Sequence, residues 1–67
     1  MEFKISDETK LSQIAKFIEN LSMGTIVSFS YQIADINYTK RINSSKPILE
    51  INKEILLWME NCQLGIF

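Results

Sequence analysis

The sequence contains no histidine, and its 67 residues include only one cysteine, one proline and two glycines. Without histidine the chain lacks the usual general base at neutral pH, the most common metal ligand and every histidine-dependent catalytic triad. A lone cysteine, Cys62, excludes a disulfide within the chain, so cross-links do not offset its small size. Two glycines, Gly24 and Gly65, are too few for a glycine-rich phosphate or dinucleotide loop. We therefore expect no enzyme activity, no catalytic residues, no metal and no cofactor.

Strong charge of either sign is also missing, since seven basic and eight acidic residues leave a net charge of −1. No overall field would draw such a chain to a phosphate backbone or an anionic membrane. No apolar run reaches the 18 or so residues of a membrane span, and the first eight residues lack the apolar core of a signal peptide. These features predict a cytoplasmic protein without a membrane partner.

Large apolar side chains are abundant, because 26 of the 67 residues are Ile, Leu, Met, Phe, Trp or Val. With so little net charge, this content favours a folded chain over a disordered one. The length allows one small domain, residues 1–67. In a domain of this size the free energy gained from apolar burial and the conformational entropy lost are nearly equal. A partner that covers further apolar surface would therefore matter to its stability.

The first half of the chain predicts a helix and a short strand. At 100° per residue a helix over residues 7–23 has an apolar face, with Ser6 or Asp7 as its N-cap and Gly24 just after its C-terminus. That face consists of Leu11, Ile14, Ala15, Phe17, Ile18 and Leu21. Alternation of apolar and charged residues over 2–5 permits a short strand before the helix.

The period changes to two after Gly24, which predicts a hairpin of strands over residues 27–33 and 36–42. The alternation of apolar and polar residues shifts by one position at Ala34-Asp35, which places the turn there. This pair is a poor type I′ turn, so the sequence leaves a loop longer than two residues open as an alternative. The apolar face then pairs Ile33 with Ile36, Tyr31 with Tyr38, Phe29 with Lys40 and Val27 with Ile42. The other face, expected to be solvated, holds Ser28, Ser30, Gln32, Asn37, Thr39 and Arg41.

The last third has two interpretations. Residues 48–51 form a third strand and Asn52 caps a helix over 53–63, which we favour, or Pro47 starts one longer helix. Both place a core stripe at Ile51, Ile55, Trp58, Met59 and Cys62, where Cys62 is a buried structural residue. The expected fold is α+β: an N-terminal helix, an antiparallel β-hairpin or three-stranded sheet, and a C-terminal helix.

With a third strand, this element order resembles that of double-stranded RNA-binding domains. Such domains carry a lysine-rich cluster at the start of their last helix, where this chain reads Asn52-Lys53-Glu54-Ile55. The resemblance is therefore one of element order, and it implies a nucleic-acid-binding module as an alternative function. The basic residues available for it are Lys40, Arg41 and Lys46.

Apolar residues on the last helix also lie outside the core stripe. Leu57 and Leu64 project nearly opposite it, and Leu56 points in a third direction. A chain of 67 residues cannot easily enclose a helix, so either the tail folds back over Leu57 or a partner covers these residues. The predicted partner-binding residues are Leu56, Leu57, Leu64, Ile66 and Phe67.

Three functional hypotheses follow from these observations. The leading one is a small non-enzymatic protein-binding regulator or inhibitor, of the kind that phages and mobile elements direct at a host enzyme or defence complex. The second is the nucleic-acid-binding module, for which the charge balance provides little support. The third is a structural homo-oligomer, such as a homodimer joined through the last helix.

Overall fold

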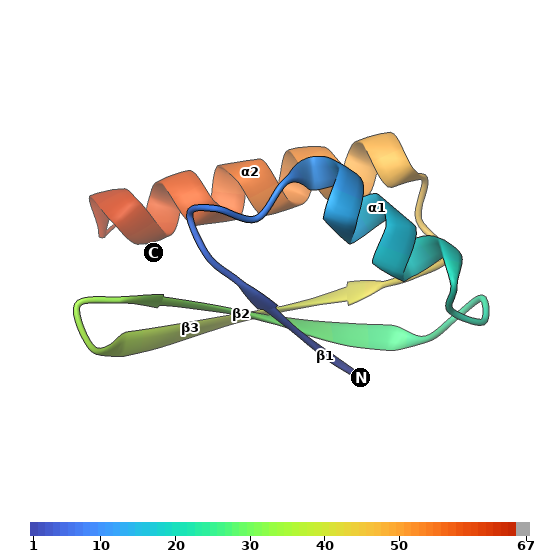
Figure 1. Ribbon diagram of the computed structural model, residues 1–67, viewed down its shortest axis with the longest axis horizontal. Coiled ribbons are helices and arrows are strands. Elements are labelled where there is room, and N and C mark those ends of the chain that lie inside the picture. The colour runs from blue at the N-terminus through green and yellow to red at the C-terminus, as the bar shows by residue number, and fades with distance from the viewer. Residues whose placement is uncertain (66–67) are drawn as a thin grey trace.

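A computed structural model describes residues 1–65 of the chain and shows two helices lying on one face of a three-stranded sheet (Figure 1). The elements in chain order are β1 (Glu2–Ile5), α1 (Leu11–Glu19), β2 (Ile26–Ile33), β3 (Ile36–Asn43) and α2 (Ile48–Leu64). The central strand β2 pairs in parallel with β1 and antiparallel with β3. The predicted α+β fold is thus confirmed, with a mixed sheet of three strands.

The hairpin has the predicted register, including Tyr31 opposite Tyr38 and Val27 opposite Ile42. Of the loop lengths that the sequence left open, the structure has the shorter one, since Ile33 pairs with Ile36 and only Ala34 and Asp35 lie between them. Both residues are left-handed, with φ of 48° and 67°. Pairing along two eight-residue strands outweighs the local cost of this turn.

The third strand of the sheet is β1, and the favoured strand over residues 48–51 is wrong. Those residues form the first turn of α2, where the amide of Ile51 donates to the carbonyl of Pro47 at 3.0 Å. Asn52 consequently lies inside the helix and is not its cap. The physical reason is the core: helical spacing buries Ile51 and Ile55 on the same side. The observed order, β-α-β-β-α, also differs from the order on which the resemblance to double-stranded RNA-binding domains was based.

Helix α1 is shorter than predicted at both ends. The expected cap residue Ser6 instead closes a separate turn, in which its amide donates to Thr9 Oγ1 at 3.0 Å and its carbonyl accepts from the Thr9 amide at 3.1 Å. At the other end the helix stops at Glu19, and Gly24, at φ 81°, belongs to the loop that leads into β2. The apolar positions Ile14 and Ile18 are buried as predicted.

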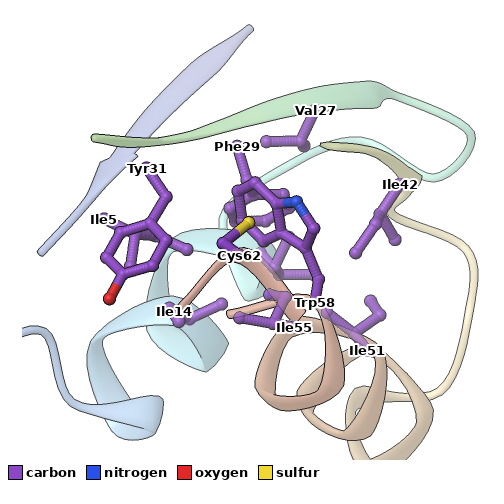
Figure 2. Close-up of a cluster of buried hydrophobic side chains, with 11 residues drawn as sticks. Ile5, Ile14, Val27, Phe29, Tyr31, Ile42, Ile51, Ile55, Trp58 and Cys62 are labelled. Atoms are coloured by element: carbon purple, nitrogen blue, oxygen red, sulfur yellow. The ribbon is translucent and has the colours of Figure 1, made fainter. Parts of the chain in front are cut away.

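The core lies between the sheet and the two helices (Figure 2). Strands contribute Ile5, Val27, Phe29, Tyr31 and Ile42, while the helices contribute Ile14, Ile18, Ile51, Ile55, Trp58 and Cys62. On the opposite face of the sheet Gln32, Asn37, Thr39 and Arg41 are exposed. Ser30 is an exception to the expected solvation, because it is buried in the middle of that face. Its hydroxyl has no hydrogen-bond partner among the described residues.

Candidate protein-docking face on α2

The rotation of α2 about its own axis is determined by its contacts with the sheet. Ile51, Ile55, Trp58 and Cys62 are all buried and repeat at intervals of three or four residues. The Trp58 ring meets the Tyr31 ring of β2 edge-on, with ring centres 6.1 Å apart (Figure 2). Large rings that interlock in this way leave little freedom for the helix to turn. Each remaining side chain of α2 therefore points in a defined direction.

A hydrogen-bonded group holds the C-terminal end of α2 against the strands. The hydroxyl of Tyr31 donates to Asp7 Oδ1 at 2.5 Å and accepts a hydrogen bond from Gln63 Nε2 at 3.0 Å. Tyr31 lies on β2, Asp7 follows β1 and Gln63 belongs to α2. The two hydrogen bonds therefore join three segments that are distant in sequence. The hydrogen bond to the Asp7 carboxylate, with a smaller effect of burial, raises the pKa of Tyr31 above its ordinary value of 10.0. The protonated, hydrogen-bonding form is thus the one that the fold favours.

An ion pair lies near the other end of α2. Lys46 Nζ, in the loop before the helix, donates to Glu54 Oε2 at 2.9 Å. This hydrogen bond raises the pKa of Lys46 above 10.5. Both side chains are partly open to solvent, so the pair orients the loop more than it stabilises the fold.

The side of α2 opposite the core carries exposed leucines. Leu49, Leu56, Leu57 and Leu64 are 76%, 51%, 60% and 62% exposed, and we call this set the leucine face. At 100° per residue they occupy an arc of about 100°, centred about 180° from the buried stripe. In Figure 1 no other helix or strand of residues 1–65 lies beyond α2 on the side away from the sheet. Exposed leucines concentrated on one helix face are typical of a protein contact surface.

The structure brings Leu56 and Leu57 together with Leu64 on this face, as part of the predicted partner-binding set. The other two predicted members, Ile66 and Phe67, lie outside the described residues. Sequence reasoning missed Leu49, because the favoured one of the two interpretations places residues 48–51 in a strand. The signal was present, since Leu49 precedes Leu56 by seven residues, the same interval that separates Leu57 from Leu64.

Comparisons with known proteins add nothing to these observations. No protein-family model, curated protein or solved structure matches the chain. The leucine face is therefore the feature from which a function has to be inferred.

The three basic residues considered for nucleic-acid binding do not share one surface. Lys40 and Arg41 are neighbours on β3, so their side chains point to opposite faces of the sheet. Lys40 lies opposite Phe29 on the helix-covered face, and Arg41 lies opposite Ser28 on the open face. Lys46 is engaged with Glu54. No basic surface is formed by the three together.

Cys62 lies within the core at 3% exposure, and burial raises the pKa of its thiol above 9.0. A buried, protonated thiol is a poor nucleophile. Within residues 1–65 there is no group of three or more Asp, Glu or Cys side chains placed to hold a metal ion. No helix in that part of the chain has the length and apolarity needed to cross a membrane.

One concavity of about 470 Å³ opens beside the end of β1. Its lining includes one basic residue, Lys4, and one acidic residue, Asp7, together with the neutral amides Gln32 and Asn37. Ser30, whose hydroxyl is buried, also lines it. Tyr31, which shares with Asp7 the hydrogen bond described above, lines it as well.

Proposed function

We propose that this chain is a small non-enzymatic protein-binding module, a regulator or inhibitor that acts by docking the leucine face of α2 on another protein. The observation that carries the proposal is the exposure of Leu49, Leu56, Leu57 and Leu64 on a helix whose other side is anchored in the core. The anchoring prevents the helix from turning these residues inward, and within residues 1–65 no other segment covers them.

The energetics of such a contact are favourable for a small module. Fully burying a leucine contributes about 1.5–3 kcal/mol, so covering four leucines that are half to three-quarters exposed would contribute on the order of 4–8 kcal/mol. A rigid helix also loses little conformational freedom on binding. A regulator of this kind acts by occupying a surface of its target, such as an enzyme or a defence complex of a host cell. The absence of histidine and the burial of Cys62 support that mode of action over catalysis.

The test replaces the two leucines in the C-terminal half of the face by aspartate, in the double variant Leu57→Asp/Leu64→Asp. Tagged wild-type protein and the variant are each incubated with a host lysate, and retained protein and nucleic acid are both analysed. We expect the variant to lose a protein that the wild type retains, while its circular dichroism spectrum stays unchanged. Met23→Asp is the matched control, because Met23 is 87% exposed but lies in the loop after α1.

Retention of the same protein by the wild type, the Met23→Asp control and the double variant would contradict the proposal. So would retention of nucleic acid alone that weakens steeply as the salt concentration rises, since that is the behaviour of a nucleic-acid-binding module.

A further inference from the structure

The leucine face has an internal symmetry that the individual exposures do not reveal. Two charged residues, Lys53 and Glu60, are also exposed and lie on the same side of α2 between the leucines. Measured from the midpoint between Leu56 and Leu57, Lys53 and Glu60 are equally distant in the two directions along the helix. Leu49 and Leu64 are equally distant as well. Every member of the face therefore has a counterpart across this midpoint.

Such a pattern is self-complementary under a two-fold rotation. If a second copy of α2 runs antiparallel to the first and the axis passes through the midpoint, Leu56 faces Leu57 of the second copy. In the same register Leu49 faces Leu64 of the second copy, and Lys53 faces Glu60 of the second copy. Each apolar residue then meets an apolar residue, and each charge meets the opposite charge, which is the arrangement of an isologous dimer interface.

The two charges also select the direction of the second helix. In a parallel pair Lys53 would meet Lys53 of the second copy, and Glu60 would meet Glu60 of the second copy. Juxtaposed like charges disfavour a complex and are a common means of excluding wrong arrangements. Only the antiparallel arrangement satisfies the leucines and the charges together.

We propose that the leucine face binds a second copy of this chain through an antiparallel α2–α2 contact centred between Leu56 and Leu57. The inference rests on the proposed docking role of this face and names its partner. The contact spans the 16 residues from Leu49 to Leu64, a strip about 22 Å long and about 10 Å wide. That is small beside the roughly 800 Å² per partner of a standard interface, so the dimer is a weak one, with a dissociation constant in the micromolar range. A heterologous target then competes with dimerisation for the same face.

A charge-reversal cycle on the purified full chain tests this register. Sedimentation equilibrium over about 1 µM to 1 mM protein at low ionic strength measures the dissociation constant. Lys53→Glu or Glu60→Lys alone places two like-charge pairs in the symmetric interface, and we expect each to weaken the dimer by roughly tenfold. The double variant Lys53→Glu/Glu60→Lys restores both pairs with reversed polarity and should return to within about threefold of the wild type.

Two variants on α1 serve as controls. Lys16→Glu and Glu19→Lys make the same changes in charge at exposed positions of a different helix and should leave the dissociation constant unchanged. A chain that stays monomeric over the whole concentration range would overturn the inference. A dimer that responds equally to all four single variants, or that the double variant fails to restore, would overturn the antiparallel register. Neither result affects the lysate experiment, so failure of this inference is distinguishable from failure of the proposed function.

Discussion

Replacing the turn of the β2–β3 hairpin should make the protein more stable. Ala34 and Asp35 are both left-handed, and both are exposed, so their side chains have no packing role that a substitution would remove. Non-glycine residues pay about 1–2 kcal/mol for this conformation, and alanine has no side-chain hydrogen bond to compensate. Asn-Gly is the sequence that a two-residue turn of this kind prefers. The perturbation is therefore Ala34→Asn/Asp35→Gly.

The expected gain is smaller than the full relief of strain. Asp35 tolerates the left-handed region better than alanine does, and the new glycine gives the unfolded chain more conformational freedom, which costs about 0.4–1 kcal/mol. We expect a net increase of about 1–1.5 kcal/mol in the free energy of unfolding. For a chain of this length that corresponds to a rise of about 4–12 °C in the thermal midpoint. The midpoint is measured by circular dichroism at one low protein concentration, so that dimerisation does not contribute.

Ala34→Val serves as the opposing variant, because a β-branched residue is strongly disfavoured at positive φ. It should lower the thermal midpoint. If the Asn-Gly variant is no more stable than the wild type and the valine variant is no less stable, the two-residue left-handed turn is not a source of strain. A confirmed gain would also provide a stabilised background for variants of α2.

Two further predictions concern the interior. Tyr31→Phe should lower the free energy of unfolding by about 0.5–1.5 kcal/mol at neutral pH, because the hydrogen bonds to Asp7 and Gln63 are lost. Since the pKa of Tyr31 is raised on folding, its contribution is complete below about pH 10 and disappears as the pH rises through the raised value. Denaturant titrations should therefore show a weaker loss of stability at alkaline pH in the phenylalanine variant than in the wild type, and parallel curves would refute the role of this hydroxyl. The Cys62 thiol should react with a thiol reagent such as Ellman's reagent much more slowly in the folded chain than in denaturant, because the thiol is buried and its pKa is raised. Equal reaction rates in the two conditions would show that α2 is not held against the core.

The candidate site was only partly predictable from the sequence. Leu57 and Leu64 were identified because they project away from a stripe of apolar residues spaced for a helix. Leu49 was missed because four residues, Ile48–Ile51, are too short a segment for periodicity to separate a strand from a helical turn. The symmetry of the face became visible only once Leu49 was placed on the same helix as Leu64.

Local periodicity alone determined the hairpin with its register and the buried side of α1, since alternation and 3.6-residue spacing describe which face of an element is apolar. Periodicity does not encode which segment completes a sheet. β1 pairs in parallel with a strand more than 20 residues away, and that choice depends on packing between distant residues. Tertiary packing also decided that α2 begins at Ile48, because a buried Ile51 is compatible with both the strand and the helix interpretation of residues 48–51. The sequence thus determined which residues are apolar and how they are spaced along the chain, while the fold decided which of them remain exposed on α2.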